Sequence, residues 1–145
     1  MSELAYKDPY PNFRFRIELD GIQRGGFREA SGLDIKNEAI SYREGNSKAS
    51  TTNKVPGLTT YANITLRTGM TDDSELYEWM KQSVDGKTKR KHGSIILLDE
   101  AGEEKIRWDF ERAFVVDWSG PNFNAGASEV AIESITIAHE GVARK

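Results

Sequence analysis

The chain has 145 residues, of which 30% are charged, with a formal net charge of −3 and no cysteine. One domain of this length can bury a hydrophobic core without disulfides or metals. The near balance of charge argues against a surface that attracts nucleic acid, and the lack of cysteine excludes thiolate catalysis and cysteine-ligated zinc.

The chain is expected to form a single domain, residues 1–145, that begins with an N-terminal arm, residues 1–11. This arm contains Pro9 and Pro11 and lacks the apolar run of a secretion signal. No stretch approaches the roughly 20 apolar residues that a membrane-spanning helix needs. We therefore expect synthesis and folding in the cytoplasm, without membrane insertion of the monomer.

The first predicted element is a two-faced β-strand over residues 12–20, where apolar and polar residues alternate. Asp20-Gly21 is a turn signal, so residues 22–30 are expected to return as the second strand of a hairpin. The next predicted strand, residues 33–43, has apolar residues at odd positions up to Ile35 and at even positions from Ile40. A β-bulge near Asn37 to Ala39 would absorb the extra residue.

A long polar stretch, residues 45–57, is predicted to be an extended loop. Its Gly45–Pro56 portion has only Ala49 and Val55 to offer apolar surface. Ordering about 12 residues costs on the order of 10 to 20 kcal/mol, and these side chains recover little of it at about 25 cal/mol per Å². Connections of this length are usually functional, so we expect the loop to become ordered only against a partner.

Strand rhythm returns over residues 61–67, with Asn63, Thr65 and Arg67 on the polar side. A helix is predicted over residues 73–84, because acidic residues suit its first turn and Asp72 and Glu75 have capping-box spacing. The apolar stripe of this helix consists of Leu76, Trp79, Met80 and Val84.

Three further strands are predicted at residues 95–98, 105–118 and 129–140. The first is apolar enough to be covered on both faces, and the second keeps its apolar residues on one face except at Arg112. The third changes phase near Glu133. This pattern predicts a mainly β fold in which two packed antiparallel sheets form a barrel-like subunit with one α-helix and a long polar loop.

Motifs that could carry chemistry have simpler structural interpretations. Gly86-Lys87-Thr88 resembles the end of a phosphate-binding loop, but it follows the predicted helix, whereas that loop precedes one. The basic cluster at residues 87–91 lacks the aromatic residues of a nucleic-acid groove, and His92 and His139 lack metal-ligand spacing. We predict no catalytic residue, cofactor, metal or specific nucleic acid, while a carboxylate pair assembled by folding stays open.

Several segments together carry a family resemblance. They read Phe27-Arg28-Glu29-Ala30-Ser31-Gly32-Leu33, Tyr42-Arg43-Glu44-Gly45, Lys54-Val55-Pro56-Gly57-Leu58-Thr59, Trp118-Ser119-Gly120-Pro121, Glu129-Val130-Ala131-Ile132-Glu133-Ser134 and His139-Glu140-Gly141-Val142. In this order they resemble the tail-tube proteins of contractile phages and phage-tail-like contractile injection systems. The chain is also similar to the tube protein of type VI secretion.

This resemblance implies a structural protein and not an enzyme. It implies hexameric rings that stack into a hollow tube, which sheath contraction drives through a target envelope and which conducts cargo. The implied partners are further copies of the chain, a sheath protein, baseplate or tube-initiator proteins and lumenal cargo. The implied location is a particle assembled in the cytoplasm and released to the outside.

Site residues are assigned by combining the resemblance with the strand pattern, because unpaired strand edges suit ring closure and stacked rings form an open filament. The ring-ring interface candidates are Tyr42, Arg43, Glu44, Asn46, Lys48, Thr51, Asn53, Lys54, Pro56 and Leu58. The lumen-facing candidates are Asn63, Thr65 and Arg67, and the sheath-facing candidates are Glu75, Glu78 and Lys81.

Two other functions remain open at this point. A tube-initiator or baseplate adaptor paralogue would share the same motifs and form a single ring. A small-molecule-binding β-barrel would be a monomer with an apolar pocket.

Overall fold

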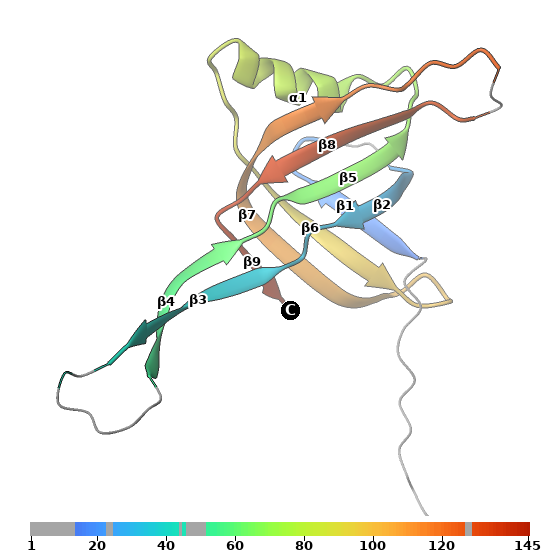
Figure 1. Ribbon diagram of the computed structural model, residues 1–145. Helices are drawn as coiled ribbons and strands as arrows, with labels where there is room; N and C mark the ends of the chain where they lie inside the picture. The colour runs from blue at the N-terminus through green and yellow to red at the C-terminus, as the bar shows by residue number, and fades with distance from the viewer. Residues whose placement is uncertain (1–13, 23–24, 44, 46–51, 127–128) are drawn as a thin grey trace, which may run out of the picture.

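The computed structural model describes residues 14–22, 25–43, 45, 52–126 and 129–145. These residues form nine β-strands and one α-helix (Figure 1), so the predicted mainly β fold with a single helix is confirmed. Among the described residues, no helix combines the length and the apolar character needed to cross a membrane.

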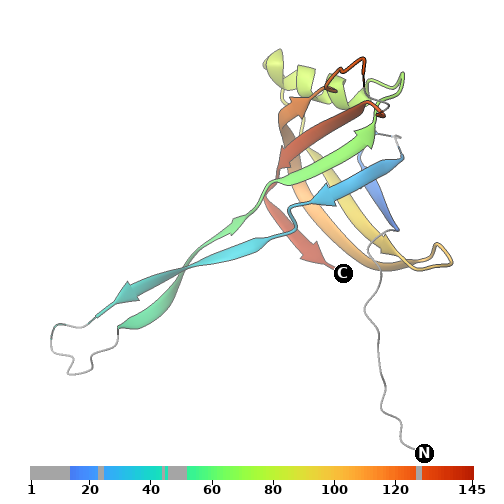
Figure 2. The same cartoon turned by 45° about the vertical axis from the view of Figure 1, so that its right-hand side comes forward.

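Seven strands form one curved antiparallel sheet that wraps around the core (Figures 1 and 2). Its order is β1 (Phe15–Leu19), β6 (Lys91–Leu98), β7 (Glu104–Ser119), β8 (Ile132–Ala138), β5 (Ile64–Gly69) and β2 (Phe27–Ser31), and β9 (Gly141–Arg144) pairs with β7. The curved sheet has two layers, and the long strand β7 takes part in both. One layer consists of β1, β6, β9 and the first part of β7, and the other consists of β2, β5, β8 and the last part of β7. The described ladders leave β1 and β2 at the two ends of the sheet, so the barrel does not close.

Two irregularities in β7 let one strand serve both layers. Arg112 has a positive φ of 51°, and the register shifts beside it, where Lys91 faces Ala113 while Gly93 faces Phe110. A second shift lies between Val115 and Asp117. The buried face therefore moves from Phe110 to Ala113 and Val115, and the prediction of one continuous even face over residues 105–118 was wrong.

Strands β3 (Ile35–Tyr42) and β4 (Asn53–Tyr61) form a separate two-stranded sheet, which projects away from the body (Figures 1 and 2). The prediction of a loop over residues 45–57 was wrong in its second part, because residues 53–57 belong to β4. The predicted bulge is present, since Asn37 faces Thr59 and Ala39 faces Pro56, but the extra residue lies on β4. Ile35 and Ile40 therefore point to opposite faces of this hairpin.

Two other strand predictions were also wrong. Residues 22–30 do not return along β1: an isolated bridge joins Leu19 to Ile22, and β2 pairs with β5. The last long strand begins at Ile132, and β8 buries Glu133, Ile135 and Ile137 with no change of phase.

Helix α1 (Glu75–Val84) covers one end of the body and packs against β7. It begins two residues after the predicted start, with Ser74 as N-cap and with Asp73 Oδ1 accepting a 2.8 Å hydrogen bond from the Glu75 N–H, so the capping role predicted for Asp72 was wrong. Leu76 and Trp79 enter the core, whereas Val84 is exposed. The core consists of Ile17, Leu19, Ile22, Ile64, Leu66, Leu76, Trp79, Ile95, Phe110, Ala113, Val115, Ile135 and Ile137.

One carboxyl group lies inside this body. Glu133 is only 1% exposed, and its Oε2 accepts a 2.9 Å hydrogen bond from the indole N–H of Trp118. Tyr77 of α1 packs edge-on against the same indole, with 5.1 Å between the ring centroids. Trp118 therefore links the buried carboxyl group to the helix.

Replacing Trp118 with Phe is expected to lower the free energy of unfolding by about 1–3 kcal/mol, because the buried Glu133 loses a hydrogen-bond donor. Urea unfolding followed by circular dichroism measures this loss. Trp108→Phe, at a half-buried position of β7, serves as the control for lost indole area and is expected to cost less. Equal losses in the two variants would contradict the role of this hydrogen bond.

Candidate assembly surfaces

The β3–β4 hairpin is open to solvent on both of its faces. Its exposed apolar side chains are Ile35, Ile40, Tyr42, Val55 and Leu58, and Leu58 is 73% exposed. A lone two-stranded hairpin is marginally stable in water, and scattered single apolar residues are normal at a surface whereas a concentration of them marks an interaction site. The hairpin therefore has the properties of a segment completed by another chain.

The predicted ring-ring residues fall into two groups. Six of them lie exposed on the hairpin or directly after β3, namely Tyr42, Arg43, Asn53, Lys54, Pro56 and Leu58. The other four, Glu44, Asn46, Lys48 and Thr51, lie outside the described residues. The structure thus brings the described members together on one projecting element.

A short joint fixes the direction in which the hairpin leaves the body. The Ala62 N–H donates a 3.0 Å hydrogen bond to the carbonyl of Asp34, and Nε2 of His139 lies 3.0 Å from the carbonyl oxygen of Ala62. The rings of Tyr61 and His139 are 5.7 Å apart. Gly32 in this joint has no room for a side chain, because a Cβ there would lie 2.0 Å from the carbonyl oxygen of Asn63.

One face of the β2–β5–β8 layer and of the adjoining end of β7 packs on the core, and the opposite face is polar. Strand register aligns this polar face in two cross-strand rows. The rows are Ser31, Thr65, Thr136 and Asp117, and Glu29, Arg67, Ser134 and Ser119. The hydroxyls of Thr65 and Thr136 are 3.2 Å apart, and Arg67 forms a 2.9 Å ion pair with Glu29.

The polar face contains two of the three predicted lumen residues, Thr65 and Arg67. Asn63 lies in the joint, outside any strand. The other six members of the two rows were not predicted, because the expected partner of β2 and the expected phase of β8 were wrong and no neighbour was assigned to the polar side of β7. Strict alternation of Ser134, Thr136 and Ala138 with the buried Ile135 and Ile137 is the signal that would have identified the β8 members.

The predicted sheath-facing residues lie on α1 with unequal exposure. Glu78 and Lys81 are exposed, whereas Glu75 is half-buried. Glu78 accepts a 3.1 Å hydrogen bond from the Ser74 hydroxyl, and Lys81 forms a 3.3 Å ion pair with Asp85. Such exposed pairs contribute little to stability, so these side chains stay available to a partner.

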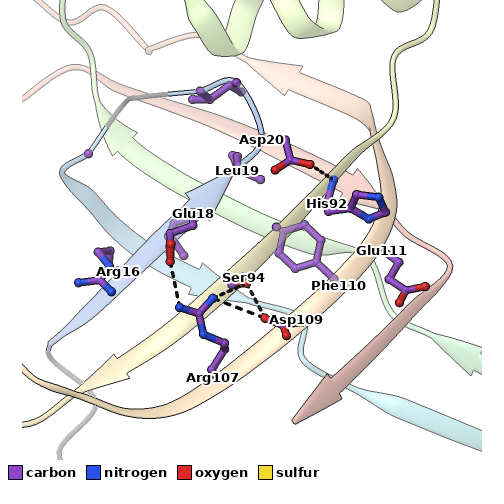
Figure 3. A pocket seen from close by; sticks show the side chains of 15 residues that line it. Arg16, Glu18, Leu19, Asp20, His92, Ser94, Arg107, Asp109, Phe110 and Glu111 are labelled. Carbon is purple, nitrogen blue, oxygen red and sulfur yellow. Dashed lines mark hydrogen bonds and ion pairs between the residues drawn. The ribbon is translucent and has the colours of Figure 1, made fainter. Parts of the chain in front are cut away.

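A hollow of about 900 Å³ lies over β1, β6 and β7 (Figure 3). Arg107 occupies it and binds Glu18 at 3.1 Å and Glu104 at 2.6 Å, while the Ser94 hydroxyl donates a 2.5 Å hydrogen bond to Asp109. The hydrogen bond to Glu104 is the main factor that raises the pKa of Arg107 above its ordinary value. Glu18, Glu104 and Asp109 are thus engaged by a permanent cation, which is the arrangement of a structural ion-pair network.

A family model, T4-like virus tail tube protein gp19, matches residues 11–143. No curated protein gave a significant match.

Solved structures of contractile injection systems contain similar chains. One comes from the sheath-tube complex of an extracellular contractile injection system, PVC, in the extended state, with 30% identity, a TM-score of 0.84, and coverage of 94% of this chain and 91% of that chain. Another comes from the tube terminating cap of the anti-feeding prophage, with 32% identity, a TM-score of 0.89, and coverage of 99% and 95%.

Hcp1 from Flavobacterium johnsoniae shares the fold alone, with 18% identity, a TM-score of 0.55, and coverage of 90% and 93%. The family match spans nearly the whole chain, and the two injection-system chains agree with it over nearly their full lengths. The chain belongs to the T4-like virus tail tube protein gp19 family.

Proposed function

We propose that this chain is the inner-tube subunit of a contractile injection system or contractile phage tail. The observation that carries the proposal is the family match over residues 11–143, together with 30% identity to a chain of a sheath-tube complex. Membership in a family of structural tube proteins favours a structural role over catalysis. The subunits form hexameric rings, and the rings stack into a hollow tube.

Ring closure uses the open edges of the curved sheet. β1 and β2 end the strand order of the described residues, and each presents backbone N–H and C=O groups on its outer side. Edge strands of this kind pair readily with other strands, and a closed ring of identical subunits leaves no edge unpaired. Neighbouring subunits in a ring are therefore joined by strand addition.

The polar face lines the lumen of the tube. Its side chains are mostly short hydroxyls, and the Arg67–Glu29 ion pair neutralises two of its charges. A wall of this composition offers moving cargo neither an apolar surface nor a strong field of one sign. Thr65 and Arg67 keep their predicted lumenal role, and Ser134 and Thr136 join them.

The exposed hairpin makes the contact between rings, and α1 lies on the outside, where Glu78 and Lys81 meet the sheath. The similar chains come from a sheath-tube complex, a terminating cap and a baseplate. Sheath, terminator and baseplate proteins are accordingly the expected partners of this chain. Assembly takes place in the cytoplasm, and the particle acts outside the cell.

Negative-stain electron microscopy of the purified chain tests this function. We expect rings with a central hole, and tubes of stacked rings at high protein concentration or in the presence of a preformed ring. Analytical ultracentrifugation of the same sample is expected to show species larger than the 16.3 kDa monomer. A monomer at every concentration tested would contradict the proposal and favour the ligand-binding barrel.

A second candidate function is that of a tube terminator or initiator that forms a single ring. The similarity to the anti-feeding prophage cap and to the PVC sheath/tube terminator, at 32% and 31% identity, favours keeping it. Particle length separates the two roles. Tubes of many rings grown from the chain alone identify the main tube protein, and single rings under all conditions identify the terminator or initiator.

A further inference from the structure

A groove of about 530 Å³ opens between β1 and β2, the two end strands of the curved sheet (Figure 1). Most of its lining is apolar and comes from β1, β2, β6 and β7, namely Phe15, Ala30, Ile95, Leu97 and Trp108. Ile95 is buried, whereas the other four are only partly buried. The groove is therefore an open extension of the core, and covering it would remove apolar surface from water.

Two features of the groove indicate which segment it can bind. The aromatic rings of Phe15 and Trp108 line it, and aromatic grooves recognise extended, proline-rich segments. Arg28 also lines it, and this exposed side chain forms no hydrogen bond or ion pair within the part of the chain that the structure describes. Because Arg67 already pairs with Glu29, the groove offers one unpaired positive charge.

The N-terminal arm contains a segment of this chemistry. Residues 8–11 read Asp-Pro-Tyr-Pro, so a carboxylate precedes two prolines that favour extended backbone. The arm leads directly to the groove, because Phe15 is part of the lining. The five residues from Tyr10 to Phe15 can span roughly 17 Å, and facing sheets lie about 10 Å apart. The arm is therefore long enough to cross from β1 towards β2.

We infer that residues 8–11 of the N-terminal arm seat in this groove of their own chain. The Pro9–Pro11 stretch packs against Phe15 and Trp108, and the Asp8 carboxylate forms an ion pair with Arg28. A segment tethered a few residues away has a high effective concentration at the groove, which favours it over the arm of a second copy.

The seated arm lies between the edges of β1 and β2, which the proposed function assigns to ring closure. It therefore slows strand addition between free subunits until another copy displaces it. This consequence rests on the proposed function, whereas the contact of the arm with the groove does not.

Photo-cross-linking of the full chain tests the contact. p-Benzoylphenylalanine replaces Tyr10, and the sample is irradiated at a dilution at which sedimentation shows the 16.3 kDa monomer. Mass spectrometry is expected to find cross-links to the groove strands, at residues 28–30, 95–97 or 108. The same photoreactive residue in place of Tyr77, a 45% exposed aromatic residue of α1, is the matched control and is expected to give none of these cross-links.

Charge reversals test the ion pair in the same assay. Asp8→Arg is expected to lower the yield of the groove cross-link by up to about fivefold, the range for loss of an exposed ion pair. Adding Arg28→Asp to this variant is expected to restore the yield. Glu3→Arg, a reversal of the same kind elsewhere in the arm, is the control and is expected to leave the yield unchanged.

Cross-links that fall only on other surfaces would overturn the inference. So would cross-links between ordinary and ¹⁵N-labelled copies in a mixed sample, or a yield that Asp8→Arg leaves unchanged. Deleting residues 1–11 is expected to speed ring formation several-fold, and unchanged or slower ring formation would overturn the shielding of the strand edges. The cross-linking results are obtained on the monomer, so they differ from failure of the proposed function, in which the parent chain forms no ring.

Discussion

Replacing Ile40, Tyr42 and Val55 with threonine is expected to stop tube growth at single rings. Ile40 faces Val55 across the hairpin, and Tyr42 lies two residues further along the same face. Threonine is β-branched, which suits a strand, and it removes most of the apolar surface at each of the three positions. Each lost side chain costs about 1 kcal/mol or more, so the contact between two rings loses roughly 3 kcal/mol per subunit. Every subunit of the ring loses the same amount, so the loss per ring is several times larger.

The body of the triple variant is expected to keep its stability within about 0.5 kcal/mol, because these side chains take no part in the core. Thermal unfolding by circular dichroism checks the fold, and negative-stain images check assembly. Val84→Thr, at an exposed position of α1, is the control for a lost apolar side chain outside the hairpin. Tubes of normal length from the triple variant would show that this face of the hairpin makes no ring contact.

Gly32→Ala is expected to lower the free energy of unfolding by about 3 kcal/mol or more. Gly32 has a φ of +102°, and a Cβ there would lie 2.0 Å from the carbonyl oxygen of Asn63 and 3.0 Å from Cα of Ile64. Both obstacles are backbone atoms, so relief requires the joint itself to move. The surviving folded molecules are therefore expected to carry a misdirected hairpin and to assemble poorly.

Alanine substitutions at Gly25 and Gly26 distinguish the cost of the steric conflict at Gly32 from the cost of a positive φ. Gly26 has a φ of +75° and no atom within 4 Å of an added Cβ, so Gly26→Ala is expected to cost about 1 kcal/mol. Gly25 has no such φ and equally open surroundings, so Gly25→Ala is expected to change stability by less than about 0.5 kcal/mol. Urea unfolding of all three variants tests this order, and equal losses for Gly26→Ala and Gly32→Ala would contradict the account of the joint.

The sequence predicted elements that are covered on one face much better than it predicted their partners. Alternation at Phe15, Ile17 and Leu19 identified β1, and the spacing of Leu76 and Trp79 identified α1, because each buries a regular stripe. Nothing local in Phe27–Ser31 distinguishes β1 from β5 as a neighbour, although the two arrangements differ in topology. The turn signal at Gly21 is real, with a φ of 73°, and yet it leads to no strand pairing beyond one bridge.

Exposure and burial of unexpected residue types explain the other errors. β4 is exposed along most of its length and contains Pro56 and Gly57, so it shows neither alternation nor an apolar run. Pro56 is tolerated because it lies beside the bulge. In β8, the buried Glu133 has the pattern of an exposed acid, and its hydrogen bond from Trp118 across the sheet cannot be read from the local sequence.

The same distinction applies to the assembly surfaces. The hairpin residues were predicted as ring-ring contacts because a polar stretch with few apolar atoms gains little by becoming ordered alone, and this assignment stays a prediction. The β8 members of the polar face were missed because the expected change of phase near Glu133 does not occur. The two register shifts in β7 cancel, so Asp117 and Ser119 lie opposite Trp118, as the alternation predicts.

A cryo-electron microscopy reconstruction of particles assembled from the purified chain tests the central claim most directly. The account predicts a hollow tube in which Thr65, Arg67, Ser134 and Thr136 face the lumen, and in which the β3–β4 hairpin of each ring lies on the next ring. A particle whose inner wall is formed by a different face of the subunit, or whose hairpins extend free into solvent, would contradict it.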